Sequence, residues 1–279
     1  QFFVLENESM QLVFSNLGGA LCEVNLPIKG KAHPDSVILP VGEDKLIKVQ
    51  APLSNLFPLH TYKKSVDGQV EQFEPHEDGY YTLLRRAIAR KDPRASTRVP
   101  AKFYAANIVS DDEALASLTY SVKSITDKQI VFTASYKGRK ITKTFELPTD
   151  GSQAPYVVLA TVDVQGDKRG LYFTSGVPEV EFVAGRVAPS IHYTAYNGTD
   201  LTTHSFKLPK SSSQLDGTTP DWTSNSNGYF SVIVDPLDKV KSGFISSGSR
   251  SGLTSSQSRK AALAFWGRGE WPVMHFLAL

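Results

Sequence analysis

Cysteine is almost missing from this sequence, because Cys22 is the single cysteine among 279 residues. One cysteine cannot form an internal disulfide, and no Cys/His spacing typical of a zinc site is present, which excludes a disulfide scaffold and a structural zinc ion. Cys22 follows the apolar Leu21 in a strand-like context, which favours a small buried side chain over an activated thiolate. We therefore expect no metal and no cofactor.

An excess of charge is also lacking, since 30 Lys and Arg residues stand against 28 Asp and Glu residues. This balance argues against nucleic acid as the main partner. The longest apolar runs, such as Pro155–Val164, are shorter than the about 20 residues that a membrane-spanning helix needs. The chain begins at Gln1 without a methionine or a signal-peptide pattern, and we expect a segment of a longer protein whose membrane anchor lies outside it.

Catalytic motifs are lacking as well. The stretch SSGSRSG (246–252) is out of step with the Gly-x-Ser-x-Gly motif of hydrolases and has no strand-turn-helix context. The histidines show neither the HxH nor the HExxH spacing of metal sites. They are His33, His60, His76, His192, His204 and His275. The sequence thus predicts no catalytic residue.

Alternating apolar and polar residues are abundant. Short alternating runs, separated by turn residues at a spacing of roughly 8 to 12, are typical of a sandwich or barrel. The expected strands are 10–16, 20–27, 115–123, 129–137, 139–148, 156–165 and 229–236. Helical periodicity is scarce, and the two expected short helices are Thr82–Ala89 and Lys260–Trp266. The fold class is therefore all-β, two packed antiparallel sheets with one or two short helices.

One hairpin can be predicted in detail. Gly138 can take the positive φ of a tight turn, and Ile141, Lys143 and Phe145 alternate with polar residues, so that one face is buried. No repeat or composition break divides the chain before residue 240, whereas residues 241–279 form a Ser/Gly-rich, atypical tail in which we expect no further strands. We expect one domain over 1–240, followed by a truncated or disordered tail.

Three stretches carry a resemblance to a known family. The run MQLVFSN, LGGAL, CEVNLP resembles the opening of galactose-mutarotase-like β-supersandwiches, where the glycines serve a tight turn between strands. Residues 6–27, 140–166 and 222–236 are similar, in this order, to stretches of the periplasmic domain of YidC/Oxa/Alb membrane protein insertases. The last of them matches a pattern of Trp, spacer, Tyr-Phe, strand and Pro.

The resemblance implies an accessory, non-catalytic domain on the periplasmic side of a bacterial inner membrane. It would assist insertion and folding of membrane proteins, as a chaperone-like body or as a docking surface for accessory subunits of the Sec translocon, and nascent membrane proteins would be partners of the full-length protein. The resemblance places the contact within Tyr156–His204. The partner-binding residues it suggests are Tyr156, Val158, Tyr172, Phe173, Tyr193 and Tyr196.

Two alternatives stay open. Residues 85–98 carry six cations, which form either a patch for acidic lipid or an acidic partner, or a solvated surface: Arg85, Arg86, Arg90, Lys91, Arg94 and Arg98. The other function class is a carbohydrate-binding module or a mutarotase-like sugar epimerase, which would use a His and a Glu as general acid and base. His60 and His192 are the histidines in loop or strand-end settings, but neither has the His-Pro context of these enzymes, and the His-Pro at His33 comes too early in the chain.

Overall fold

A computed structural model gives the fold of the chain. It describes residues 1–31, 33–39, 62–73, 80–84, 87–88, 97–149, 154–178, 190–207, 213–218, 220–238, 243–249, 260–266 and 274–278. In several of these strands the description is limited to the backbone, namely 62–64, 72–73, 87–88, 97–98, 206–207, 213–218, 243–249, 260–266 and 274–278. Within the described residues, no helix has the length and apolar character needed to cross a membrane.

The first of two large sheets has eight strands and begins at the N-terminus. Its strands are β1 (Phe2–Glu6), β2 (Gln11–Ser15), β3 (Ala20–Pro27), β4 (Tyr62–Val66), β5 (Gln69–Phe73), β6 (Tyr80–Leu84), β9 (Ala105–Val109) and β14 (Tyr172–Ser175). They pair in the order β14-β9-β3-β2-β1-β4-β5, and β6 pairs with β3. The pairs are antiparallel except β1 with β4, which is parallel.

The second large sheet has nine strands, all antiparallel to their neighbours. Its strands are β10 (Ser121–Ile125), β11 (Gln129–Tyr136), β12 (Arg139–Glu146), β13 (Val158–Gln165), β15 (Ser190–Asn197), β16 (Asp200–Lys207), β18 (Pro220–Ser226), β19 (Ser231–Pro236) and β22 (Met274–Ala278). The order is β10-β11-β12-β13-β22-β19-β18-β15-β16, so β10 and β16 are its two edges. The predicted hairpin is β11–β12, and Gly138 has the expected positive φ of 76°.

Smaller elements complete the described structure. They are the sheet β17 (Ser213–Thr218), β20 (Gly243–Ser249) and β21 (Lys260–Trp266), the pair β7 (Ala87–Ile88) and β8 (Thr97–Arg98), the 3₁₀-helix η1 (Ala101–Phe103) and the helix α2 (Glu113–Ala116). The Asp112 side chain caps α2 by accepting from the Ala114 N–H at 3.2 Å. This helix lies where the sequence predicted the start of a strand at residue 115, so that prediction was wrong for its first residues.

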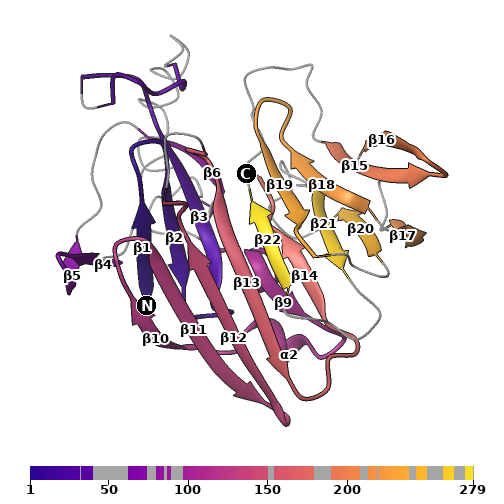
Figure 1. The fold of residues 1–279 in the computed structure, drawn as a ribbon, viewed down its shortest axis with the longest axis horizontal. Coiled ribbons are helices and arrows are strands. Elements are labelled where there is room, and N and C mark those ends of the chain that lie inside the picture. The colour runs from indigo at the N-terminus through magenta and orange to yellow at the C-terminus, as the bar shows by residue number, and fades with distance from the viewer. Residues whose placement is uncertain are drawn as a thin grey trace.

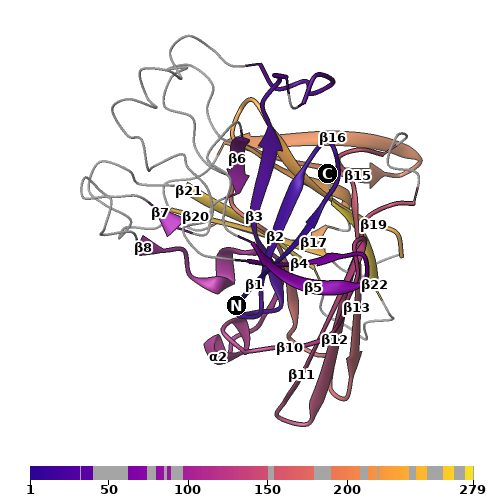
Figure 2. The same ribbon diagram turned by 90° about the vertical axis from the view of Figure 1, so that its left-hand side faces the viewer.

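The two large sheets pack face to face (Figures 1 and 2). Phenylalanines from both sheets meet at the centre of the core, where Phe14 and Phe145 have ring centroids 4.7 Å apart and Phe3 and Phe132 5.8 Å apart. Large apolar side chains at alternate positions of both sheets thus supply the buried area that stabilises the sandwich. The predicted fold class, packed antiparallel sheets with a short helix, is confirmed.

The outer face of the first sheet has a smaller core of its own. Cys22 is buried there with Val13, Ala20 and Tyr104, and its Sγ donates to the Val13 carbonyl at 3.2 Å. The predicted buried role of Cys22 is confirmed, since its thiol is packed as a small apolar group.

Both helices expected from the sequence were wrong. Thr82 lies in β6, which pairs with β3, and its hydroxyl donates to Asn25 Oδ1 at 3.0 Å instead of capping a helix. Lys260–Trp266 is β21, which pairs with β20 along its whole length. In both segments pairing with another strand overrides the local helical preference.

The segment after residue 240 contains strands β20, β21 and β22, contrary to the expectation that it has none. The backbone of β22 lies between β13 and β19, inside the nine-stranded sheet. The partner strand β13 lies more than 100 residues earlier in the chain than β22, so this pairing could not be read from the local composition of the segment. The domain boundary at residue 240 stays a prediction.

Candidate functional site

The glycine pair of the N-terminal signature forms the turn between β2 and β3. Gly18 and Gly19 have φ of 82° and 52°, in the left-handed region where glycine is favoured. A Cβ on Gly18 would lie 2.8 Å from Asn107 Nδ2, and one on Gly19 would lie 2.7 Å from Cγ of Tyr120. The pair therefore serves geometry, as predicted, and allows Asn107 and Tyr120 to press against the turn.

A lysine lies beneath this turn, fully inside the sandwich. The Nζ of Lys143 donates to the Gly18 carbonyl at 2.7 Å, to the Ala106 carbonyl at 3.1 Å and to Asn107 Oδ1 at 3.3 Å. An ammonium group has three N–H donors, so all three are satisfied. The Nζ also lies 5.0 Å from the centroid of the Tyr120 ring, at a distance typical of a cation–π contact.

The hydrogen bonds of Lys143 join the two sheets. Burial lowers the pKa of Lys143 well below its ordinary value, and burial also raises the pKa of Tyr120, whose hydroxyl has no hydrogen-bond partner among the described residues. Lys143 is 0% exposed, so its amine does not reach a substrate in solution. Its chemistry is to fasten the Gly18–Gly19 turn and β9 to β12 of the opposite sheet.

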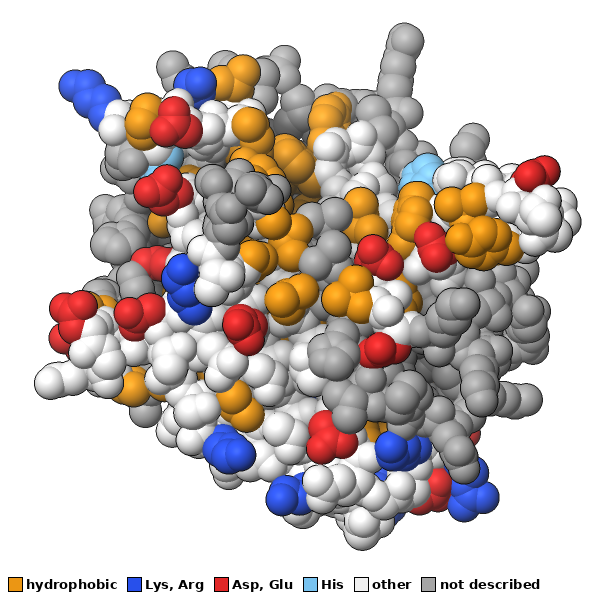
Figure 3. Space-filling model, viewed as in Figure 1, with side chains coloured by type: hydrophobic (Ala, Val, Ile, Leu, Met, Phe, Trp, Pro, Cys, Tyr) orange, Lys and Arg blue, Asp and Glu red, His pale blue; other side chains and the backbone are white. Residues whose placement is uncertain are grey.

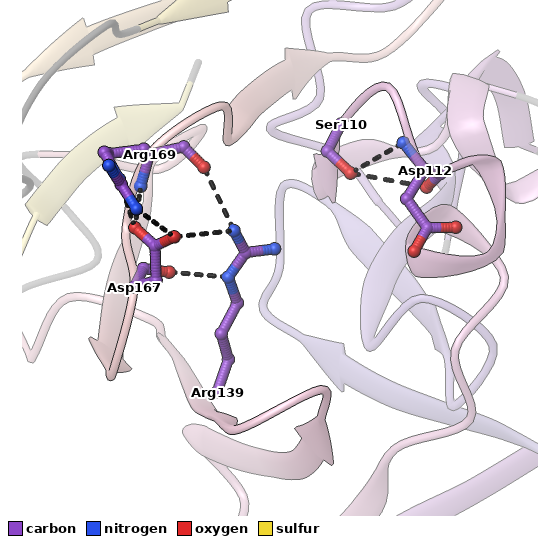
Figure 4. A network of polar contacts seen from close by, with 5 residues as sticks. All are labelled: Ser110, Asp112, Arg139, Asp167 and Arg169. Carbon is purple, nitrogen blue, oxygen red and sulfur yellow. Dashed lines mark hydrogen bonds and ion pairs between the residues drawn. The ribbon is translucent and has the colours of Figure 1, made fainter.

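Charged side chains lie at the turns beyond one end of the nine-stranded sheet (Figure 4). Arg169 Nε lies 2.9 Å from Asp167 Oδ1, and Arg139 Nη2 lies 3.9 Å from Asp167 Oδ2 and donates to the Arg169 carbonyl at 3.1 Å. Chiefly because of the hydrogen bond from Arg169, the pKa of Asp167 falls to about 2. These contacts link the turn after β13 to the start of β12.

A second group in the same region surrounds Asp112, whose backbone N–H donates to Ser110 Oγ at 3.1 Å (Figure 4). Lys137 Nζ and the Tyr136 hydroxyl donate to Asp112 Oδ2 at 2.6 and 2.8 Å. Both hydrogen bonds, led by that from Lys137, lower the pKa of Asp112. The β11–β12 hairpin is thereby joined to the start of α2.

Replacing Arg169 with glutamine should return the pKa of Asp167 towards its ordinary value of 3.8, because the strongest donor to its carboxylate is weakened. A carboxyl with a lowered pKa contributes stability above its unfolded pKa and loses it as pH falls through the folded pKa. A carbon-13 NMR titration of the Asp167 carboxyl measures the shift, and Lys168→Gln is the control. An Asp167 pKa unchanged by Arg169→Gln contradicts the assigned cause.

Three of the six side chains predicted to bind a partner are buried. Val158 and Phe173 belong to the main core, and Tyr193 is buried with its ring stacked on His204 at 4.9 Å between centroids. In this structure their side chains pack against other residues of the domain, and a contact of these residues with a partner stays a prediction. These positions were suggested by the family resemblance, which does not tell which face of each strand is covered.

The other three lie nearer the surface. Tyr156 and Tyr172 are half-buried, and Tyr196 is 64% exposed. Tyr196 pairs across the β15–β16 hairpin with Leu201, which is 50% exposed. Figure 3 shows hydrophobic side chains gathered over the upper and central part of one face of the molecule. Of the six predicted partner-binding side chains, that of Tyr196 is therefore the most accessible to a partner.

Other predicted positions are only partly described. The basic patch of Arg85, Arg86, Arg90, Lys91 and Arg94 lies outside the described residues, and of Arg98 only the backbone, in β8, is described. His60 and His76 also lie outside, and of His275 only the backbone is described. His192 Nε2 lies 2.8 Å from Ser190 Oγ. The part of the chain that the structure describes holds no group of three or more His, Cys, Asp or Glu side chains suited to a metal ion.

Two carboxylates that sequence analysis missed lie on adjacent strands. Asp221 in β18 and Asp235 in β19 come together through strand pairing, and burial together with the charge of Asp221 raises the pKa of Asp235. Within the described residues, neither has a cationic partner at ion-pair distance. The two carboxylates are brought together by the pairing register of β18 with β19, which no local sequence motif indicates.

The sequence of the chain is similar to those of named proteins. No family model matches the chain. Over 250 residues, 88% of the chain, it is 33% identical to the membrane protein insertase YidC of Chlamydia caviae, and it is 31% identical to YidC of Chlamydia trachomatis over 252 residues. The chain is homologous to part of the membrane protein insertase YidC. It spans about 30% of the length of these YidC relatives, so the homologous region is a domain-sized part of a longer protein.

Homology to YidC confirms the family resemblance predicted from the three sequence stretches. Two solved structures also align along nearly the whole chain: a GalM/aldose epimerase homologue from C. elegans, 9% identical over 100% of this chain and 98% of its own, with a TM-score of 0.47, and a galactose mutarotase related enzyme from Lactobacillus acidophilus, 11% identical over 99% and 96%, with a TM-score of 0.45. Both TM-scores are below 0.5, so neither structure assigns an activity to the chain.

Proposed function

We propose that the chain is an accessory domain of a membrane protein insertase, without catalytic chemistry of its own. The observation that carries this proposal is the homology to YidC over 88% of the chain. The finer parts of the proposal are a periplasmic location, a chaperone-like role towards nascent membrane proteins and docking to accessory subunits of the Sec translocon.

Side-chain exposure supports a docking role on the β15–β16 hairpin. Tyr196 and Leu201 are neighbouring apolar side chains in contact with solvent, and large exposed apolar groups that cluster are typical of interaction sites. Asp221 and Asp235 lie on strands of the same sheet, and their charge is not neutralised by any described cation. A partner that combines apolar and basic side chains would suit this surface.

Photo-crosslinking in the full-length protein tests the docking role. A photoreactive amino acid in place of Tyr196 should give adducts with a Sec accessory subunit or a nascent membrane protein in intact membranes. The matched control is the same amino acid in place of Lys140, which is exposed in β12 near the other end of the sheet. If Tyr196 gives no more adduct than Lys140, docking at this hairpin is wrong, although the homology to YidC stands.

Polarimetry tests the non-catalytic part of the proposal. We expect the chain to leave the mutarotation rates of galactose and glucose at their uncatalysed values. Catalysed mutarotation that is lost in His192→Ala would contradict the proposal, because it would show general acid–base chemistry at this imidazole. The matched control is His204→Ala, because His204 lies on the neighbouring strand β16.

A further inference from the structure

The strand β16 is an open edge of the nine-stranded sheet. It is the last strand in the sheet order, and among the described strands only β15 pairs with it. Every residue from Asp200 to Ser205 is exposed, so neither face of the hairpin end is covered. Figure 1 shows the β15–β16 hairpin projecting at the side of the molecule. An edge strand presents unpaired N–H and C=O groups, which can pair with another strand.

The features that normally guard an edge are missing from β16. The opposite edge, β10, carries Lys123 at its middle and a bulge between Val122 and Ser124. By contrast, β16 pairs with β15 without interruption over eight residues, contains no proline, and has no Lys, Arg, Asp or Glu between Asp200 and Lys207. Central charges, prolines and bulges are the devices that stop edge-to-edge pairing, so the two edges of one sheet differ in this property.

We infer that β16 pairs antiparallel with β16 of a second copy of this chain, so that two nine-stranded sheets become continuous. The strand begins with Asp200 and ends with Lys207, so antiparallel pairing with a second β16 keeps the two acidic ends apart and the two basic ends apart, and no like charges oppose each other. Because β16 is exposed from Asp200 to Ser205, an added strand gains no continuous apolar layer. A strand that is itself hydrophilic, such as β16, fits this environment better than a continuous apolar segment.

Two-fold symmetry limits the register of this pairing. The axis lies perpendicular to the sheet, so a residue of β16 must face its own equivalent, and the central position is Thr203 or His204. In either register the directly opposed side chains lie on the same face of the continuous sheet. The contact is a single pair of strands and is smaller than a standard interface, so we expect a weak dimer in reversible exchange with the monomer.

Sedimentation equilibrium of the 279-residue chain tests the pairing, with circular dichroism as the check on folding. The mass should rise with concentration from 30.6 kDa towards twice that value. Like charges face each other across the axis in Thr203→Lys if Thr203 is central and in His204→Lys if His204 is central, so at least one of these variants should weaken dimerisation on the order of tenfold. The control Ser121→Lys adds the same charge to β10, the opposite edge of the sheet, and should leave dimerisation unchanged. A monomer at all concentrations, or a dimer insensitive to both Thr203→Lys and His204→Lys, overturns the inference.

Disulfide trapping gives a second readout that does not depend on weak association being measurable. Thr203→Cys or His204→Cys should form an intermolecular disulfide under mild oxidation, because facing residues of paired strands have Cβ atoms within reach of one. The native Cys22 is buried and does not compete. Ser121→Cys is the control. Trapping no faster at either β16 position than at Ser121 contradicts the pairing, whereas the proposed insertase function is unaffected.

Discussion

Replacing Lys143 with methionine should lower the free energy of unfolding by about 2 to 4 kcal/mol, measured by urea denaturation. Methionine has nearly the same length and fills most of the space, but it donates to none of the three buried oxygens of Gly18, Ala106 and Asn107. Asn107 Oδ1 still accepts from the Ile108 N–H at 2.8 Å, whereas each buried carbonyl that loses its donor costs about 1 to 3 kcal/mol, and relief from burying one cation offsets part of that loss.

Lys140→Met is the matched control for this prediction. Lys140 lies in the same strand, three residues earlier, but it is exposed and pairs through its backbone only in the described contacts. The same chemical change there should alter stability by less than about 0.5 kcal/mol. If Lys143→Met and Lys140→Met are equally stable, the polar contacts of Lys143 do not hold the sheets together.

The pH dependence of Lys143 has a definite sign. Burial lowers its pKa below the ordinary value of 10.5, so in the interval between the folded and unfolded pKa the unfolded chain binds more protons than the folded one. Stability therefore rises with pH through that interval in the wild type, and this rise is lost in Lys143→Met. Denaturation up to about pH 9.5 stays below the ionisation of unfolded tyrosine, whose ordinary pKa is about 10.

The sequence predicts the strands better than it predicts the side-chain contacts between the two sheets. The alternation of Ile141, Lys143 and Phe145 correctly predicts one buried face of β12, because alternate residues of a strand point to the same side. It cannot predict the acceptors of Lys143, since Gly18 is 125 residues away and joins the site only when the two sheets pack. The glycine pair was correctly assigned to a turn, while its contact with Tyr120 depends on the same packing.

The errors have the same origin. Lys260–Trp266 has a composition that favours a helix, yet its backbone is committed to pairing with β20. Val158 in β13 and Phe173 in β14 belong to different sheets, and both side chains lie in the core between the sheets, which the alternation along one strand could not show. Likewise, Asp221 and Asp235 become neighbours only through the register of β18 on β19. The local sequence pattern thus predicts secondary-structure elements. Predicting which side chains meet at a site also requires knowing the order of the strands in each sheet.

Replacing Gly19 with alanine should lower the free energy of unfolding by about 3 kcal/mol, because two costs add. The backbone has a φ of 52°, which a residue with a Cβ adopts at a cost of about 1 to 2 kcal/mol. The new Cβ would also lie 2.7 Å from Cγ and 2.9 Å from Cδ1 of the buried Tyr120 ring, which cannot move aside without disturbing the core. Urea denaturation measures the loss.

Two controls and one double variant separate these costs. Gly68 and Gly138 also have positive φ, of 78° and 76°, but a Cβ on either meets nothing within 4 Å, so alanine there should cost only about 1 kcal/mol. Adding Tyr120→Ala to Gly19→Ala removes the ring that the new Cβ strikes. The double variant should therefore lose less stability than the sum of the two single variants, because neighbouring substitutions couple. Strict additivity would mean that the close approach of Gly19 to Tyr120 contributes nothing, and that backbone conformation alone requires glycine at this turn.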